Sequence, residues 1–237
     1  MNILRSLKHI SVVFFSALLF MSCQKDDLSS DLPHNQTTFS GAAAYNAIYG
    51  SLGLDFKIDD KVLNTNEYFD LGSFVRHKSV FPGERSISLY NREKNSEVFR
   101  AGQQFSASKV YSLFFYGRDK IEMKVVEDNL ITPPAGKVKV RFANFGNNVS
   151  KDLKILKGQS TSIGDRTLAV HEVSYFHEFN SSELRFQFSN KSDISFVGIS
   201  FVPEDRSVYT VFLVPRMVSN QRELQEVDYE IKIIKHN

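Results

Sequence analysis

The feature that most restricts how this chain can fold is a two-residue alternation of apolar and polar side chains. In the stretches 137–142, 183–188 and 228–234, alternate residues are apolar and the residues between them are mostly charged or polar. Side chains that point alternately to the two faces of a sheet produce this period, whereas a helix requires a period of 3.6. Stretches 54–58 and 86–90 follow the same pattern. One buried and one solvated face is typical of antiparallel sheets, so the chain is predicted to be all-β.

Two further segments, 110–117 and 208–215, are apolar at both alternating sets of positions. Strands with two apolar faces belong in the centres of sheets, where both faces are covered. Only residues 217–226 carry a pattern that a short helix could adopt, and a long loop fits this segment equally well.

The strand pattern occurs twice, at a nearly constant spacing. Asp55 and Asp152 occupy matching positions 97 residues apart, and Asn46 and Asn144 match at a spacing of 98. The remaining matches, in the same order, are 110–117 with 208–215, and Ile87 and Leu89 with Leu184 and Phe186. Four ordered matches indicate an internal repeat.

Each copy is about 95–100 residues long with about seven strands, the size of an immunoglobulin-like sandwich. Pro133 and Pro134 lie between the copies and cannot donate ladder hydrogen bonds, so they mark a boundary. We therefore predict two tandem immunoglobulin-like antiparallel β-sandwiches, at residues 41–132 and 133–237.

The N-terminal segment is typical of an export signal. Arg5 and Lys8 precede an apolar run of 13 residues at positions 10–22. This run is shorter than the ~20 residues that cross a bilayer, and it follows a basic flank. Residues 1–22 are predicted to be a signal peptide, so the mature chain is expected to contain no transmembrane helix.

Cys23, the only cysteine, follows this run directly. Its position resembles the lipobox of bacterial lipoproteins. The resemblance implies that the leader is cut before Cys23 and that the sulfur carries a diacylglycerol, which anchors the chain in the membrane. The mostly polar residues 23–40 are expected to form a lipidated tether. The 17 residues after the cysteine, 24–40, have an r.m.s. span of about 23 Å as a flexible coil. A cleaved chain with a free thiol at Cys23 is the alternative.

The residues after the cysteine, Lys25, Asp26 and Asp27, resemble the surface-export signal of Bacteroidetes lipoproteins. The resemblance implies a location in the outer membrane, lipid-anchored and exposed at the cell surface. An ordinary solvated tether is the alternative interpretation of these three residues.

The two copies carry a set of ordered motifs. They are Tyr45-Asn46, Phe142-Ala143-Asn144, the Asp-led strand 54–59, Phe81-Pro82-Gly83 before Ile87, a Tyr-led apolar strand, and the joint 134–142. This set resembles the bacterial extracytoplasmic domain of unknown function 4397, which is often found as tandem copies. The resemblance covers roughly residues 40–215 and implies a sandwich fold and an exported location, without an established activity or catalytic residues. The second copy has Asn180-Ser181-Ser182 in place of the Pro-Gly turn.

Charge and motif content exclude several classes of function. Removing Arg5 and Lys8 from the 29 Lys and Arg leaves 27, equal to the 27 Asp and Glu, so the neutral mature chain gives no reason to expect nucleic acid as a partner. There is no glycine-rich phosphate loop and no nucleophile elbow. His171 and His177 on one strand would stand about 20 Å apart, too far for one metal ion. The sequence predicts no catalytic residue, no cofactor and no metal site.

Aromatic residues are the remaining candidates for ligand contact. Phe is mainly a core residue, so most of the 21 Phe are expected to fill the two sandwiches. Tyr116, Tyr175 and His177 are the residues we expect at a ligand, if one stacks on the surface. Tyr111 and Tyr209 open matched strands and are expected to pin a loop through the hydroxyl group, as in a tyrosine corner.

These features together predict a non-enzymatic cell-surface lipoprotein that binds a glycan or a protein, for adhesion or as an accessory module. One alternative is a structural anchor or accessory subunit of a surface fibre or outer-membrane complex, which predicts an unpaired edge strand. The other is a hydrolase with a carboxylate site between the domains, which predicts convergent carboxylates and one raised pKa.

Overall fold

The computed structural model describes residues 38–64, 67–146, 149–158, 160–190, 196–216 and 229–236. Within these ranges every regular element is a β-strand, so the all-β prediction is confirmed. None of the described residues belongs to a helix that could cross a membrane. Thr38–Asn237 form one compact unit. The predictions made for residues 1–37, including Cys23, and for 217–226 lie outside the described residues.

The first half of the compact unit contains the strands β1 (Ser40–Ile48), β2 (Leu54–Ile58), β3 (Lys61–Val62), β4 (Phe74–Val80), β5 (Gly83–Asn91), β6 (Ser96–Phe105), β7 (Val110–Gly117) and β8 (Glu122–Glu127). They form two four-stranded sheets. Inner sheet 1 has the order β4-β1-β7-β8, and outer sheet 1 has the order β3-β2-β5-β6.

The second half contains the strands β9 (Lys137–Asn144), β10 (Lys151–Lys157), β11 (Thr161–Leu168), β12 (His177–Asn180), β13 (Leu184–Asn190), β14 (Phe196–Phe201), β15 (Val208–Pro215) and β16 (Tyr229–Lys235). Inner sheet 2 has the order β12-β9-β15-β16, and outer sheet 2 has the order β11-β10-β13-β14. The predicted boundary after Thr132 falls in the segment between β8 and β9.

The two halves have the same topology, because each strand of the first corresponds to the strand eight places later in both sheets. In each half the first strand pairs antiparallel with the fourth and parallel with the seventh. A parallel pair cannot be a simple hairpin, so this shared pairing is a specific mark of one fold occurring twice. Each half has eight strands rather than the expected number of about seven.

The pairing register corrects one detail of the repeat. Ile87 in β5 lies opposite Ile58 in β2, and the residue 97 positions after Ile58 is Ile155. Ile155 lies opposite Phe186 in β13, so Phe186, and not Leu184, is the equivalent of Ile87. A shift of two residues leaves each side chain on the same face of the strand, which is why the sequence match placed the correct face inward.

Each half is a two-layer sandwich with its own apolar core. In the first, Phe56 from outer sheet 1 packs against Phe115 from inner sheet 1, with ring centroids 5.7 Å apart. In the second, Phe142 of inner sheet 2 and Phe186 of outer sheet 2 make an edge-to-face contact at 5.1 Å. The apolar faces predicted for these strands therefore do point into the cores.

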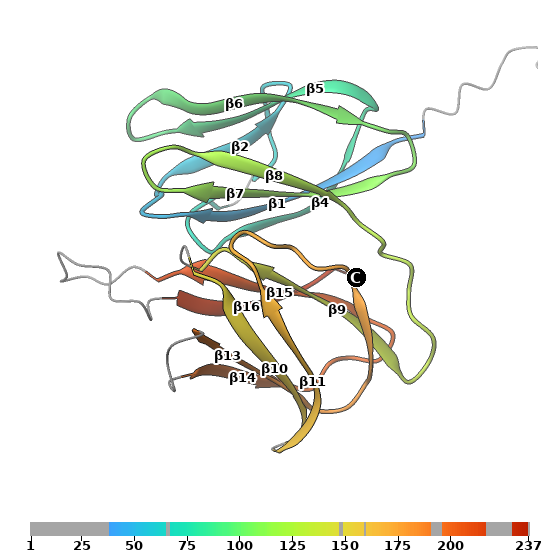
Figure 1. Cartoon of the computed structure of the whole chain (residues 1–237). Coiled ribbons are helices and arrows are strands. Elements are labelled where there is room, and N and C mark those ends of the chain that lie inside the picture. The colour runs from blue at the N-terminus through green and yellow to red at the C-terminus, as the bar shows by residue number, and fades with distance from the viewer. Residues whose placement is uncertain are drawn as a thin grey trace, which may run out of the picture. The chain divides into compact units, whose positions relative to one another are not determined.

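A third core cluster joins the two inner sheets, so the compact unit is a stack of four sheets (Figure 1). The Phe114 ring lies 4.6 Å from Tyr45 in its own sheet and 5.1 Å from Phe145 of the other sandwich. This contact covers the second face of the strands that carry apolar residues on both faces. β7 and β15 are central strands with both faces buried, as predicted.

The inner sheets present equivalent faces to each other. Tyr45 pairs with Phe114 in β1 and β7, and their equivalents 98 residues later, Ala143 and Phe212, pair in β9 and β15. All four side chains belong to the cluster between the sandwiches. The centroids of the equivalent rings Phe114 and Phe212 are 5.8 Å apart. The interface is therefore arranged like that of a symmetric dimer within one chain.

Two matched tyrosines fix corresponding loops. The Tyr111 hydroxyl accepts a hydrogen bond from the backbone N–H of Ser106 at 3.2 Å, and the Tyr209 hydroxyl accepts one from Glu204 at 2.9 Å. Both bonds join residues five positions apart, immediately before the seventh strand of each sandwich. The predicted loop-pinning role of both tyrosines is confirmed.

The interface generates a prediction about stability. Phe114 is completely buried, so Phe114→Ala is expected to lower the free energy of unfolding by about 3–5 kcal/mol, through lost burial and a cavity between the sheets. Denaturant unfolding measures this change. The control Ile131→Ala, at a side chain that is 72% exposed, is expected to change it by less than ~0.5 kcal/mol. Equal effects of the two substitutions would contradict the burial of Phe114 between the two inner sheets.

Candidate functional site

A buried ion pair lies between the two sandwiches. Arg141 of β9 alternates with apolar residues that point into the second sandwich, so its own side chain points at inner sheet 1. The side chain is 1% exposed, and its Nη1 donates to Oδ1 of Asp128, whose side chain is 0% exposed. The sequence pattern predicted a polar outer face for Lys137, Lys139 and Arg141, and for Arg141 this is wrong. The first sandwich covers that part of the face.

Hydrogen bonds complete the surroundings of this pair. Arg141 donates from Nε to Oγ1 of Thr210 at 2.8 Å and from Nη2 to Oγ of Ser112 at 2.7 Å. The Ser112 hydroxyl donates to Oδ2 of Asp128 at 2.6 Å, and Nε2 of His77 lies 3.1 Å from the same oxygen. A buried charge pair is tolerated when its donors and acceptors are satisfied in this way. Ser112 and Thr210 are equivalent residues of the two copies, so the repeat supplies both hydroxyl groups.

The environment sets the ionisation of the acidic member. Burial alone would raise the pKa of Asp128, but hydrogen bonds from His77 and Ser112 and the charge and hydrogen bond of Arg141 outweigh it. The pKa of Asp128 is therefore below its usual value, and the group is an anion at neutral pH. The hydrolase alternative required a carboxyl with a raised pKa between the domains, and Asp128 does not supply such a proton donor.

Ser112, His77 and Asp128 are also the residue types of a hydrolase triad, but their arrangement differs from one. In a triad the histidine lies between the serine and the acid, so that it can take the serine proton. Here Asp128 lies between the other two, and the serine hydroxyl donates its hydrogen bond to the carboxylate instead of to a histidine. In the described part of the chain, no hydrogen bond joins Ser112 to a histidine.

His236 closes the other side of the network. Its Nε2 lies 2.7 Å from the Thr210 hydroxyl, and its ring lies 5.5 Å from the ring of His77. Burial, together with the charges of Arg141 and His77, lowers the pKa of His236 to about 3, and the nearby Asp128 carboxylate opposes this shift only in part. The folded protein therefore keeps His236 neutral over the whole range in which an unfolded histidine titrates.

This shift predicts a pH dependence of stability. Below the unfolded pKa of about 6.5 the unfolded chain gains a proton at His236 that the folded chain excludes. Stability is expected to fall by roughly 1.4 kcal/mol per pH unit from this residue as the pH drops from about 6.5 towards 3. His236→Gln keeps a hydrogen-bonding side chain and should flatten the decrease of Tm between pH 7 and 5.

The control for this measurement is His177→Gln, at an exposed and only modestly shifted histidine. Its effect on the pH dependence of Tm should be clearly smaller than that of His236→Gln. The same steep decrease in His236→Gln as in the unchanged protein would show that His236 does not carry the effect.

A cavity of about 240 Å³ opens beside the ion pair. One wall is the end of β8 and the residues after it, 126–129, and the opposite wall is the loop 174–176 between β11 and β12. Lys139 and Arg141 of β9 also line it. The Arg141 guanidinium lies 4.7 Å from the centroid of the Phe176 ring, a cation–π contact that helps to fix both groups. We call this space the joint cavity.

The structure separates the three residues that were expected at a ligand. Tyr175 lines the joint cavity and is 92% exposed. Tyr116 instead belongs to the interface between the sandwiches, where its ring lies 4.1 Å from that of His171, and burial raises its pKa. His177 accepts a hydrogen bond from Nη1 of Arg166 at 2.7 Å. Of the three, Tyr175 is the residue that lines the joint cavity.

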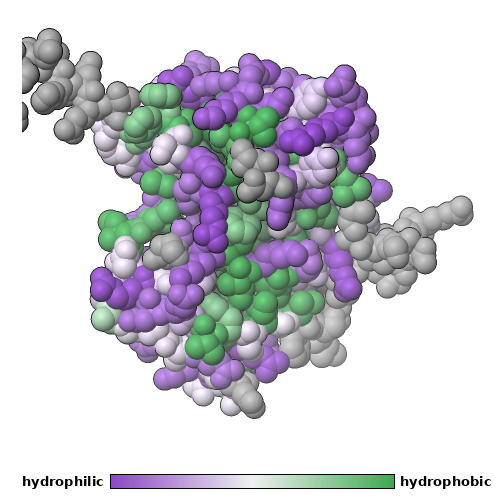
Figure 2. All heavy atoms as spheres, turned by 180° about the vertical axis from the view of Figure 1, so that it is seen from behind, coloured by the Kyte–Doolittle hydropathy of each residue, from purple (hydrophilic) through white to green (hydrophobic). Residues whose placement is uncertain are grey.

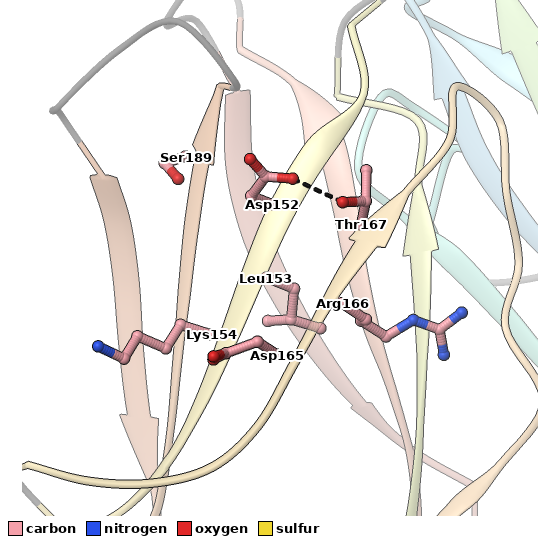
Figure 3. A pocket seen from close by; sticks show the side chains of 7 residues that line it. All are labelled: Asp152, Leu153, Lys154, Asp165, Arg166, Thr167 and Ser189. Carbon is pink, nitrogen blue, oxygen red and sulfur yellow. Dashed lines mark hydrogen bonds between the residues drawn. The ribbon is translucent and has the colours of Figure 1, made fainter.

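A second hollow, of about 500 Å³, lies on the solvent face of outer sheet 2 (Figure 3). Asp152, Lys154, Asp165, Thr167 and Ser189 come from three neighbouring strands of this sheet, and the Thr167 hydroxyl donates to Asp152 at 2.7 Å. Figure 3 shows Lys154 directed away from this bond. No aromatic residue lines the hollow, so it offers no ring on which a ligand could stack.

At the position of the first sandwich that is equivalent to this hollow, an arginine side chain lies against the acidic residue. Asp55, the counterpart of Asp152, accepts from Nε of Arg92 at 2.6 Å and lies 2.6 Å from Nη2 of the same residue. The Asn64 amide also donates to it. Asp152 is therefore hydrogen-bonded within its sheet, whereas the partners of Asp55 lie just beyond the ends of β3 and β5. Among the described residues, no group of three potential metal ligands comes together.

Surface hydrophobicity gives no simpler indication of a site. Figure 2 shows the face seen from behind, where hydrophobic residues reach the surface among hydrophilic ones, mainly towards the middle and lower part of the view. Scattered apolar exposure is normal for a soluble surface. The joint cavity is distinguished instead by the combination of an exposed aromatic side chain with a fixed, buried charge.

Comparison with known proteins identifies part of the chain. A family model described as Domain of unknown function (DUF4397) matches residues 41–152, a little under half of the sequence. The chain is thus a two-sandwich β protein that contains one DUF4397 domain. The match spans the first sandwich, β9 and the start of β10, so the resemblance noted in the sequence is confirmed there. No curated protein matches this chain.

Proposed function

We propose that this protein is a lipoprotein displayed at the surface of the outer membrane, where it binds a glycan or protein ligand without catalysing a reaction. The proposal joins the sequence of the N-terminal segment, with Cys23 after a short apolar leader, to the architecture of the compact unit. A short polar tether would hold a rigid four-layer body close to the membrane and leave its loops accessible.

We further propose that both sandwiches are immunoglobulin-like. Two features support this assignment: the size of each half, and the hydrogen bond from a loop N–H to the hydroxyl of a tyrosine five residues later, at the start of the seventh strand. The equivalent bonds of Tyr111 and Tyr209 are the most specific of these features. The identical strand order of the halves supports a tandem repeat beyond the span that the family match covers.

The observation that carries the binding function is the exposure of Tyr175 above the joint cavity. The Tyr175 side chain is 92% exposed, so it lacks the burial that usually stabilises an aromatic residue. It lies beside a cavity whose floor includes the immobilised Arg141 side chain. Aromatic side chains contribute large contact areas at binding surfaces. Tyr175 is therefore the residue at which we place the ligand.

The lipid anchor is tested by Cys23→Ala. Without the sulfur there is no site for the diacylglycerol, so the protein is expected to move from the membrane pellet to the soluble fraction. Immunoblots of fractionated cells measure this, with a serine-to-alanine change at Ser29 in the tether as the control. Membrane retention of the Cys23→Ala protein would contradict the anchor.

The surface location is tested separately by replacing Lys25, Asp26 and Asp27 with alanine. This variant keeps Cys23, so it should stay in the membrane pellet but become resistant to protease added to intact cells. Digestion at the same rate as the unchanged protein would show that these three residues do not direct surface export.

One observation favours the alternative of an accessory subunit in a surface fibre. β14 lies at the edge of outer sheet 2 and pairs only with β13 within the described part of the chain. Its sequence FVGISF contains neither charge nor proline, which are the usual protections of an edge strand, whereas the equivalent β6 contains Glu97 and Arg100. Slower hydrogen exchange of the β14 amides when the partner is present would favour strand addition.

A further inference from the structure

We propose that the joint cavity binds a uronic acid unit of an acidic glycan, with the sugar ring against Tyr175 and its carboxylate at Lys139. This inference rests on the proposed binding function and adds the chemical class of the ligand. It follows from the charges, the hydrogen-bonding groups and the size of the cavity.

The charge of the cavity is set by Lys139. Arg141 is neutralised by Asp128, and Glu127 at the wall forms an ion pair with Lys109. Lys139 donates from Nζ to the Ile131 carbonyl at 2.8 Å, and within the described residues it has no carboxylate partner. Its charge is therefore uncompensated, and a lysine ammonium has two further N–H donors available. An anionic group is the ligand that this position favours.

The other wall residues indicate a ligand that both donates and accepts hydrogen bonds. The Asn129 amide offers a donor and an acceptor, and the Glu127 carboxylate offers only acceptors. Sugar hydroxyl groups can satisfy both types at once. The side chain of an acidic peptide has acceptors only, so it would leave the Glu127 oxygens facing another anion. The wall chemistry therefore favours an acidic sugar over an acidic peptide.

The aromatic residue and the size of the cavity agree with one ring of a longer chain. Tyr175 presents an exposed ring with an apolar face, which matches the C–H face of a pyranose. The volume of about 240 Å³ is below the range of roughly 300–1,000 Å³ for sites that enclose a drug-sized molecule. One sugar unit would enter, and its neighbours would extend over the surface.

The floor of the cavity is preorganised for this contact. The Arg141 side chain is held by hydrogen bonds to Thr210, Ser112 and Asp128 from both sandwiches, and Phe176 stacks on it. A wall that is already fixed avoids the entropy cost of ordering side chains on binding. The cavity exists only where the two sandwiches meet, so neither sandwich alone would provide it.

The test is isothermal titration of the full-length protein in detergent with trimers of galacturonate, glucuronate and mannuronate. At least one trimer should bind no less than tenfold more tightly than its neutral methyl ester, because esterification removes only the charge. The preference should weaken as the salt concentration rises, since Lys139 is partly exposed to solvent. Absence of binding by all three trimers, or equal affinity for the methyl esters, would overturn the inference.

Variants locate the site. Lys139→Gln should abolish the preference for the charged trimer, and Tyr175→Ala should weaken the binding of charged and neutral trimers at least fivefold. Tyr68→Ala is the matched control at a half-exposed aromatic residue outside the cavity, and it should bind like the unchanged protein. Far-UV circular dichroism and Tm verify that each variant is folded. Equal effects of Tyr175→Ala and Tyr68→Ala would remove the joint cavity as the site.

Two further outcomes separate this inference from the function on which it rests. If a triglutamate peptide binds more tightly than every uronate trimer, the ligand class is wrong although the cavity is a binding site. If no uronate binds while the Cys23 and Lys25-Asp26-Asp27 variants behave as expected, surface display stands and only the ligand class fails. Loss of surface display with intact uronate binding would support the ligand class and contradict the proposed surface location.

Discussion

The contact between the two inner sheets is the interaction on which the rest of the structure depends. β7 and β15 carry large apolar side chains on both faces, and a two-layer sandwich can bury only one of them. Full burial of one such side chain contributes roughly 1.5–3 kcal/mol, so a separate sandwich would leave a substantial apolar surface in water. Stacking the inner sheets removes Tyr45, Phe114 and Phe212 from solvent and makes a four-layer body from two smaller units.

The buried pair of Arg141 and Asp128 gives this contact a defined position. Removing two charges from water costs much of what their attraction returns, so such a pair adds little net stability. Its hydrogen bonds reach Ser112 in one inner sheet and Thr210 in the other. A slip of one sheet along the other would separate these partners and leave buried charges unsatisfied. The apolar rings provide the attraction, and the polar network selects one register.

Much of the fold could be predicted from the sequence, because side-chain alternation records the faces of strands directly. The repeat, the central strands β7 and β15, and the loop contacts of Tyr111 and Tyr209 were all visible there. The position of Arg141 was not, because a charge in an alternating strand usually marks a solvated face. A signal was present nevertheless: when β15 is apolar on both faces, the neighbouring strand β9 in the same sheet must also be covered. Sequence spacing also matched Ile87 with Leu184, whereas its structural equivalent in the second copy is Phe186. The error was not visible in the sequence, because a shift of two residues leaves the pattern of faces unchanged.

The candidate site was still harder to predict, because its residues come together only when the sandwiches pack. Tyr175 is distant in sequence from Lys139 and from the residues after β8, and these residues share no motif. Tyr175 was singled out as an aromatic residue, but Tyr116 in the same group proved to be part of the interface. Local sequence distinguishes exposed from buried aromatic residues poorly when the covering surface belongs to another half of the chain.

The matched faces of the inner sheets have a consequence for how such a site can arise. In an assembly of two identical chains, any substitution appears on both sides of the axis, so an arginine in one chain is repeated at the equivalent position of the other. Here the equivalent of Arg141 is Ala43, so the charged side chain occurs in only one of the two copies. Because the two copies are joined in one chain, each can diverge independently. An asymmetric cavity can then form at an interface whose two sides are otherwise equivalent.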